Sequence, residues 1–387
     1  MRPDLTGYED RGPAYVKHHF LADYVEGLVF KVASAWQDFV YVDGFSGPWQ
    51  NQDEEFGDTS FGIALEALKR AKDEWKRIRN HDVRMTAILV ERDPIAYARL
   101  QKVIGLYPDI HICTFNGDFV DLVPEIIRVI PAEAFTFILM DPKGWSIDMQ
   151  RVAPLMSRPN CEVVLNFMFD FINRFSRLKK PAIQTGLNAL LPGTAWRQRL
   201  DAIQEDNENG PTDRKHILVS SIVDVIKRLG RYPYVMETPV LFPAKNRTFY
   251  SLIYGTRSAK GVEVFRDAQH KALVAQDRMR EELAVRKREA ADGMRDLLAG
   301  VVPSNEPTAQ WVAEQEASAR RALIEAVPTQ PNYILYKNIW PKVLAEYGVR
   351  RTRLGRIAAE LKDEGVIRFL DWAPRKQVPD DNYRVTR

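Results

Sequence analysis

Acidic residues and glycines follow a series of apolar segments at intervals typical of a ligand-binding α/β protein. The run F-V-Y-V-D-G-F-S-G-P at residues 39–48 predicts a buried strand that ends at Asp43 and turns through Gly44 and Gly47. Glycine lets a backbone approach a ligand closely, and an acid at a strand end can accept hydrogen bonds from hydroxyl or amino groups. The same composition also occurs in β-turns that bind nothing, so the interpretation depends on the segments downstream.

Two more predicted strands end near acids whose positions suit a nucleotide. Residues 85–90 run into Glu91, and an acid at the end of the second strand of a doubly wound sheet meets the ribose hydroxyls of a bound nucleotide. Residues 111–115 run into N-G-D, where Asp118 could contact the exocyclic amine of an adenine. Glu91 has an alternative role as a cap on the helix that would start at Pro94.

A fourth apolar segment leads directly into the motif D-P-K-G-W. In this motif Asp141 could orient an amine, Trp145 could stack on a base, and Lys143 could meet a phosphate or a carboxylate. The alternative is that Asp-Pro merely ends the strand and starts a turn. Asn166, at the end of a fifth apolar segment, is a further candidate for contact with a substrate.

Strand and helix patterns alternate along the part of the chain that would position these residues. A helical pattern covers residues 15–38 and has Lys17, His18 and His19 near its start. We expect the two histidines at the surface or in a capping role. A second helical pattern covers residues 60–76. The predicted strands cover residues 39–43, 85–90, 111–115, 134–140 and 161–167, with a hairpin at 235–242 and 248–254. This alternation predicts the α/β class, with a mostly parallel Rossmann-like sheet, antiparallel last strands and a helical insertion at about 176–230.

Together these motifs resemble those of Rossmann-type methyltransferases that depend on S-adenosylmethionine. A sharper resemblance is to the three-Cys-motif partner (TcmP) family, through an early lysine, the D-G-F-S-G loop, the D-P-K-G motif and V-V-L-N-F at residues 163–167. The resemblance covers most of residues 10–270 and implies S-adenosyl-L-methionine as the cofactor and a cysteine-rich, iron-sulfur-like protein as a partner. The cofactor-binding residues that it implies are Lys17, Asp43, Gly44, Phe45, Gly47, Glu91, Asp118 and Asp141.

One motif departs from the pattern of methyltransferases that act on exocyclic amines. Those enzymes resemble one another in a D/N-P-P-Y/F motif, whereas here Lys143 replaces the second proline and the aromatic residue is displaced to Trp145. We therefore keep three hypotheses for function. The first is methyl transfer to a base amine of a nucleic acid, without a metal, with Asp141, Trp145, Lys143 and Asn166 at the acceptor. The others are a binding protein without turnover and a methyltransferase for a protein or small molecule.

The C-terminal part of the chain has a different composition. Residues 1–258 would form the methyltransferase-like domain, and residues 259–302, which are charged and alanine-rich, predict a solvent-exposed helical connector and linker. Residues 303–387 predict three helices, the second over 334–347, and then a two-stranded wing, an order that resembles an α+β winged helix-turn-helix.

Basic residues are concentrated in this last domain. From residue 331 to 387 there are 12 Lys and Arg against 7 Asp and Glu, a local net charge of +5 in a chain of net charge +3. Arg351, Arg353 and Arg356, near the start of the third predicted helix, would meet phosphates or base edges. Winged helices also bind proteins, which is the alternative role for this domain.

Composition sets the broad class of the chain. Its 387 residues are 45% hydrophobic and 28% charged, enough for two or three globular domains. No run of 18 or more apolar residues and no signal sequence is visible, so we expect a cytoplasmic protein without a membrane span. Cys113 and Cys161 both fall in predicted strands, which argues against a disulfide framework and a cysteine metal site.

Overall fold

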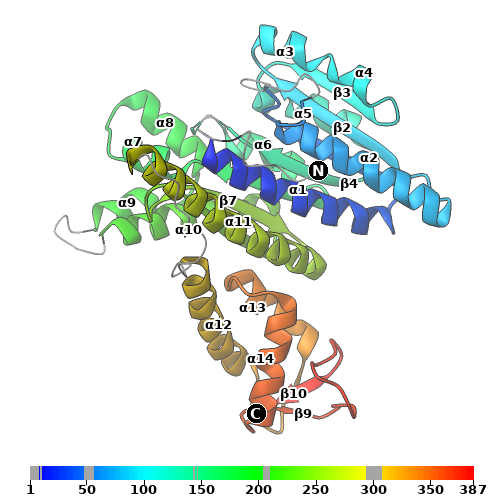
Figure 1. Cartoon of the computed structure of the whole chain (residues 1–387), viewed down its shortest axis with the longest axis vertical. Coiled ribbons are helices and arrows are strands. Elements are labelled where there is room, and N and C mark those ends of the chain that lie inside the picture. Colours follow the sequence, from blue (N-terminus) through cyan, green and yellow to red (C-terminus); the bar gives the residue numbers. More distant parts are fainter. Residues whose placement is uncertain are drawn as a thin grey trace. The chain divides into compact units, whose positions relative to one another are not determined.

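The chain folds into two compact units. The computed structural model describes residues 8, 11–47, 56–142, 144–145, 147–203, 210–292 and 307–387. The units are Met1–Arg257 and Ser258–Arg387, a division that lies beside the boundary predicted after residue 258. The first unit contains a large sheet flanked by helices, and the second is mostly helical with a small sheet (Figure 1). Among the described helices, none combines the length and the apolar character that a membrane span requires.

A seven-stranded, mostly parallel sheet forms the centre of the N-terminal unit. Its order is β3-β2-β1-β4-β5-β7-β6. The first five strands run parallel, and β7 is antiparallel to both of its neighbours. The strands are β1 (Asp38–Asp43), β2 (Arg84–Glu91), β3 (His111–Asn116), β4 (Phe135–Met140), β5 (Cys161–Phe167), β6 (Tyr234–Leu241) and β7 (Thr248–Thr256). This is a Rossmann-like α/β sheet, as the alternation of patterns predicts.

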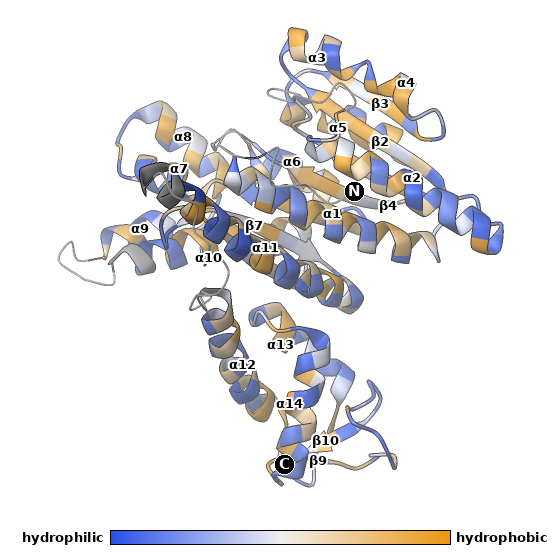
Figure 2. Ribbon diagram, viewed as in Figure 1, coloured by the Kyte–Doolittle hydropathy of each residue, from blue (hydrophilic) through white to orange (hydrophobic). Residues whose placement is uncertain are grey.

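Alternate residues along each central strand pack against different helices, so the sheet has a core on both faces. Val40 and Val42 of β1 belong to the core formed with α5 (Phe119–Val129), α6 (Met149–Met156) and α10 (Gly210–Gly230). On the other face, α1 (Gly12–Ala33) packs with β1 and with α2 (Ser60–Arg79). Because both faces are covered, the central strands are apolar almost throughout (Figure 2).

Three buried polar side chains, Asp43, Glu91 and Asn166, lie at the carboxyl ends of the parallel strands. The register pairs Asp43 with Leu89 of β2 and with Leu139 of β4, so the carboxyl ends of these strands lie together. Helices begin just beyond this edge, where Asp93 caps α3 (Pro94–Leu100) and Asp118 caps α5. The remaining helices of the unit are α4 (Val103–Leu106), α7 (Phe169–Ser176), α8 (Pro181–Leu190) and α9 (Trp196–Asp201). Acids, loops and helix N-termini therefore lie together at the carboxyl ends of the parallel strands.

Helices and a three-stranded antiparallel sheet make up the C-terminal unit. The sheet order is β8-β10-β9. The elements are α11 (Ala259–Asp292), α12 (Pro307–Ala326), β8 (Ile334–Leu335), the 3₁₀ helix η2 (Tyr336–Asn338), α13 (Trp340–Glu346), α14 (Arg351–Asp363), β9 (Arg368–Phe369) and β10 (Arg384–Thr386). The single helix predicted over 334–347 is wrong in its first part, because Ile334 and Leu335 pair with β10 instead.

The helix α11 differs from the exposed connector that its composition predicts. Phe265, Ala272 and Met279 are buried, and the helix packs on α13. The guanidinium of Arg266, 3% exposed, donates to the carbonyl oxygens of Leu344 at 2.6 Å and Ala345 at 3.0 Å. These carbonyls lie in the last turn of α13, where backbone acceptors lack helical partners, so the arginine satisfies them. The charged residues of α11 thus include one that anchors it in this unit.

Candidate active site

A cavity of about 780 Å³ opens at the carboxyl ends of the parallel strands. Its volume falls in the usual range for cofactor and substrate sites. Of the residues predicted to bind a cofactor or substrate, those that line it are Lys17, Gly44, Phe45, Gly47, Glu91, Asp118, Asp141 and Asn166. The topology therefore brings together side chains from α1 and from the ends of β1, β2, β3, β4 and β5.

The glycine loop after β1 is fixed by backbone hydrogen bonds to its neighbours. Gly44 N donates to Leu139 O at 3.1 Å, and Ser46 N donates to Val90 O at 2.8 Å. A Cβ built on Gly44 would lie 2.8 Å from the ring of Phe119, which is closer than real Cβ contacts. Glycine is required here because the loop passes directly over the start of α5.

Asp43 supports this loop from beneath and does not line the cavity. Its side chain is completely buried, and its carboxylate accepts hydrogen bonds from Phe45 N and the Tyr41 hydroxyl, both at 3.0 Å. Burial raises the pKa of Asp43 to about 6, and the two hydrogen bonds only partly oppose that rise. The predicted direct contact with a cofactor is thus replaced by a positioning contact to the loop.

Glu91 and Asp118 each use one carboxylate oxygen for the fold and present the other to the cavity. Glu91 Oε1 accepts from Asp93 N at 2.6 Å, and Asp118 Oδ1 accepts from Val120 N at 2.9 Å. Neither Glu91 Oε2 nor Asp118 Oδ2 makes a hydrogen bond to a described residue. The alternative role of Glu91 as the cap of the helix that starts at Pro94 is wrong, because Asp93 caps α3 and Glu91 instead accepts from the backbone of that cap residue. The predicted contact of Glu91 with a ligand is geometrically possible.

Lys17, Asp141 and Asn166 form a connected polar group on the cavity wall. Lys17 Nζ lies 2.5 Å from Asp141 Oδ2, and Asn166 Nδ2 donates to Asp141 Oδ1 at 2.5 Å. Because the carboxylate can only accept, the amide nitrogen of Asn166 faces it. Asn166 Oδ1 is then left buried with no hydrogen-bond partner in the described structure, and the residue is 4% exposed. A ligand that brings an N–H or O–H group to this oxygen would remove the cost of leaving it unsatisfied.

Further lining residues come from elements far away in the sequence. Met168 follows β5, and Pro243, Phe249 and Tyr250 come from the β6–β7 hairpin. Tyr250 is buried and its hydroxyl donates to Pro13 O, which joins the hairpin to α1. Sequence analysis predicts the hairpin but gives no signal that it reaches this cavity, because the contact depends on the order of strands in the sheet.

His18 also lines the cavity, contrary to the surface or capping role expected for it. The residue is 5% exposed, and its Nδ1 lies 2.8 Å from the hydroxyl of Tyr8. Burial, followed by the neighbouring charge of Lys17, lowers the pKa of His18 well below its ordinary value. His18 is therefore neutral at physiological pH and serves as a packing and hydrogen-bonding residue of α1.

Trp145 does not reach the cavity. Its ring centroid lies 5.0 Å from that of Phe171 and 5.2 Å from that of Phe175, and it covers Gly186, where a Cβ would approach the indole to 2.4 Å. This aromatic cluster anchors α7 and α8, which explains the aromatic run of residues 167–175 as packing. The predicted stacking of Trp145 on a base is not supported by this position. Lys143, which the same motif offers as a contact for a phosphate or a carboxylate, lies outside the described residues.

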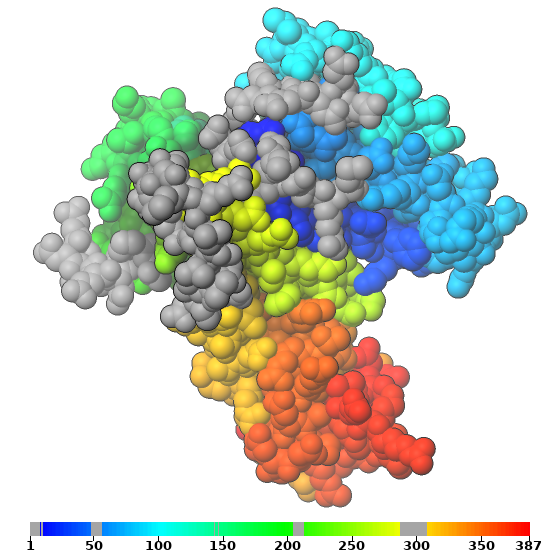
Figure 3. Space-filling view, in the orientation of Figure 1, coloured from blue at the N-terminus to red at the C-terminus, as the bar shows by residue number. Residues whose placement is uncertain are grey.

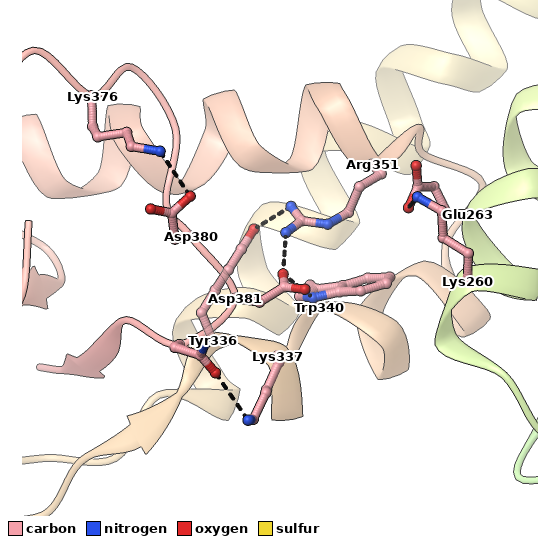
Figure 4. A network of polar contacts seen from close by, with 10 residues as sticks. Lys260, Glu263, Tyr336, Lys337, Trp340, Arg351, Lys376, Asp380 and Asp381 are labelled. Carbon is pink, nitrogen blue, oxygen red and sulfur yellow. Dashed lines mark hydrogen bonds and ion pairs between the residues drawn. The ribbon is translucent and has the colours of Figure 1, made fainter.

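The three arginines of the C-terminal unit differ in their environments. Arg351 is sandwiched over the rings of Trp340 (4.5 Å) and Tyr336 (5.0 Å), and its guanidinium pairs with Asp381 Oδ1 at 2.8 Å (Figure 4). Trp340 Nε1 donates to the same oxygen at 2.9 Å. Arg351 is thus engaged within the unit, which corrects the expectation that it is free for a phosphate.

Arg353 is engaged as well. Its guanidinium pairs with Glu316 at 2.9 Å and with Glu360 at 2.7 Å. Arg356, in contrast, is exposed and has no ion pair with any described residue. Of the three arginines predicted to contact a nucleic acid, the structure leaves only Arg356 available without breaking an existing pair.

The whole chain shows little similarity to known proteins. It matches no protein-family model and no curated protein sequence. A solved structure of loganic acid methyltransferase with SAH is similar at 8% identity, with 74% of this chain and 89% of that chain covered and a TM-score of 0.28. A likeness at that TM-score carries no argument, so the assignment of a Rossmann-like α/β fold rests on the strand order and directions described above.

Proposed function

We propose that the N-terminal unit is an S-adenosylmethionine-dependent methyltransferase that acts on a base amine of a nucleic acid. The observation that carries this proposal is the grouping of Glu91, Asp118 and the bonded pair Asp141 and Asn166 around one cavity. Acids at successive strand ends of a doubly wound sheet suit the hydroxyl and amino groups of a nucleoside. The paired amide and carboxylate on the next strands suit a second ligand beside it.

The residues present fit the nucleoside part of this cofactor. Glu91 Oε2 and Asp118 Oδ2 are open acceptors that could bind ribose hydroxyls and an adenine amine. The backbone from Gly44 to Gly47 borders the same space without an intervening side chain at either glycine. When bound, the cofactor would supply an electrophilic methyl group.

The acceptor side is built to position an amine. Asn166 Oδ1, which is buried and without a partner in the described structure, would accept a hydrogen bond from the acceptor N–H once a substrate displaces the atoms that cover it, and the bond from Asn166 Nδ2 to Asp141 fixes the orientation of the amide. Lys17 holds Asp141 in place by an ion pair. After transfer, the proton released by the methylated nitrogen can pass to the Asp141 carboxylate. Catalysis would then depend mainly on alignment of the two reactants.

Incubation of the purified protein with total nucleic acid and methyl-labelled cofactor tests the proposal. Label should enter the nucleic acid. Glu91→Ala should weaken cofactor binding by roughly 1.5 to 3 kcal/mol in calorimetry, the scale of a charged hydrogen bond. Asp141→Ala and Asn166→Ala should keep cofactor affinity and lose at least about tenfold in methyl transfer. A protein that binds neither S-adenosylmethionine nor its demethylated product would refute the proposal.

A binding function without turnover is the second candidate. It is favoured by the contacts of Asp141, because one of its carboxylate oxygens is already paired with Lys17 and the other already accepts a hydrogen bond from Asn166. In that case Asp141→Ala would leave nucleotide and nucleic-acid binding intact, and no methyl transfer would be detectable in the wild type.

For the C-terminal unit we propose a winged helix-turn-helix role in nucleic-acid binding. Its support is the succession of α12, α13 and α14 followed by the antiparallel strands β9 and β10. Arg356 is the arginine of α14 that could meet a phosphate. A partner protein rich in cysteine remains a proposal from the family resemblance alone.

A further inference from the structure

Four exposed cations lie on two segments next to the cavity. Arg177, Lys179 and Lys180 follow α7, and Lys245 lies in the turn between β6 and β7. We call these four residues the basic rim. All four are exposed, and none has a hydrogen bond or ion pair from its side chain to a described residue. They contrast with Arg351 and Arg353, whose charges are already paired.

An internal ion pair joins the two segments of the basic rim. Asp170, at the start of α7 and 5% exposed, pairs with Arg174 at 3.3 Å and with Arg247 of the β6–β7 turn at 3.0 Å. The same segments reach the cavity wall, through Met168 before α7 and through the hairpin residue Phe249. Since α7 has 8 residues, about 12 Å of helix separates the cavity wall from Arg177. The two segments that carry the rim are therefore tied to each other and to the cavity wall.

The charge on these segments is not balanced locally. Residues 174–180 and 242–250 contain six Lys and Arg and no Asp or Glu. Asp170 pairs with two of the six, Arg174 and Arg247, so the four cations of the basic rim are those that lack an acid among the described residues. Burial and then the charge of Arg177 lower the pKa of Arg214 on the neighbouring helix α10. Like charges held together without acids disfavour the folded state, and a bound polyanion would remove that repulsion.

Aromatic rings accompany the cations on the hairpin. Phe242 and Phe249 have ring centroids 4.7 Å apart, and the guanidinium of Arg247 lies 4.7 Å from the ring of Phe242. Phe249 also lines the cavity. Proteins bind unpaired strands through cations that contact the phosphates and through aromatic rings that stack on the bases. Both kinds of side chain occur on these segments.

We infer that the basic rim binds the phosphates of a single-stranded nucleic acid and leads one unpaired base into the cavity. This inference rests on the proposed function. It narrows the substrate to an unpaired strand, and it places the main surface for binding that strand on the N-terminal unit. A duplex would have to release the base first, which costs a few kcal/mol.

Salt-dependent binding of a fluorescent single-stranded oligonucleotide of about 20 nucleotides tests the inference. The rim variant carries Arg177→Gln, Lys179→Gln and Lys180→Gln. If all three cations contact phosphates, the slope of log affinity against log salt should become shallower by about 2, and adding Lys245→Gln should bring the change to about 3. Cofactor affinity should stay at its wild-type value because these side chains are exposed and do not line the cavity. The melting temperature should not fall, since the substitutions relieve the repulsion among the rim cations.

A matched control removes the same charge elsewhere on the unit. Lys69, Lys76 and Lys102 are exposed and do not line the cavity. They belong to α2 and to the α3–α4 region (blue to cyan), which lies at the opposite end of the N-terminal unit from α8 (green) in Figures 1 and 3. Changing all three to Gln should leave the slope unchanged.

Three results would overturn the inference: an unchanged slope in the rim variant, an equal change in the control, or tighter binding of the corresponding duplex than of the single strand. The measurement needs no turnover, so it separates this inference from the proposed function. Altered slopes without any methyl transfer would uphold the rim and refute the enzyme. Methyl transfer to nucleic acid with unaltered slopes would do the reverse.

Discussion

Asp43 is the most deeply buried ionisable residue at the candidate site. It is completely buried at the end of β1, with only Phe45 N and the Tyr41 hydroxyl as hydrogen-bond donors. Its folded pKa of about 6 lies above the ordinary value of 3.8. Between these two values the unfolded chain has lost the proton that the folded chain retains, so stability falls as pH rises through this window.

Asp43→Asn should remove that pH dependence, since the amide cannot ionise. Its oxygen can still accept from Phe45 N, and its nitrogen can donate to the oxygen of the Tyr41 hydroxyl. From pH 4 to pH 7 the free energy of unfolding of the variant should rise relative to wild type by up to about 3 kcal/mol. Urea unfolding of both proteins at the two pH values measures the difference. Parallel pH profiles would mean that Asp43 titrates normally in the folded state.

Gly44 offers a second test at this scale, because any Cβ there would press on the ring of Phe119. Gly44→Ala should cost about 1 to 3 kcal/mol in the free energy of unfolding and should weaken cofactor binding as the loop shifts. Gly105 is the matched control, since a Cβ at that position meets no atom within 4 Å. Gly105→Ala in the helix α4 should be neutral or stabilising by up to about 1 kcal/mol. Equal effects of the two substitutions would contradict the close approach at Gly44.

The sequence pattern correctly predicts that a residue lines the cavity where its position at the end of a strand is sufficient to place it there. Glu91 and Asp141 border the cavity because each follows a parallel strand, and such strands end at one edge of the sheet. Asp43 and Trp145 follow the same rule, yet neither reaches the cavity. The direction of each side chain depends on a partner that spacing does not reveal, a buried tyrosine hydroxyl in one case and the ring of Phe171 in the other.

At the scale of elements, the strands were more predictable than the contacts between them. The predicted strand over residues 161–167 coincides with β5, since a continuous apolar run has few alternatives. The short strand β8 was missed because two residues carry no periodic signal, and its formation depends on β10, some fifty residues later. The two strands of the β6–β7 hairpin were predicted, but their approach to α1 through Tyr250 and Pro13 is long-range.

Two arginines of α14 differ in how much their side chains contribute to the stability of the C-terminal unit. Arg351→Ala would lose contacts with two aromatic rings and an ion pair with Asp381, for a cost of about 1 to 3 kcal/mol in the stability of the C-terminal unit. Arg356→Ala, at an exposed position, should change stability by less than about 0.5 kcal/mol. Thermal unfolding followed by calorimetry distinguishes the two. Equal stability of the variants would mean that the Arg351 contacts contribute nothing measurable.

At the scale of the whole molecule, each of the two units has buried apolar residues of its own. The core of the N-terminal unit supports the sheet edge at which the cavity opens. The C-terminal unit has its own buried residues, among them Tyr336, Leu354 and Leu361, around a second small sheet. Methyl transfer and the main contact with a nucleic acid, as proposed above, would then both belong to the N-terminal unit, with further binding by the C-terminal unit.

This organisation makes a prediction about truncation after Arg257. All residues that line the cavity belong to the unit Met1–Arg257, and the sheet that positions them is complete within it. A chain of residues 1–257 should therefore bind S-adenosylmethionine with a dissociation constant within about threefold of that of the full chain, as measured by calorimetry. It should also retain the salt dependence contributed by the basic rim and lose only the part contributed by the C-terminal unit. Circular dichroism would establish that the truncated chain is folded. A folded truncated chain without cofactor affinity would show that the C-terminal unit is needed to form the site.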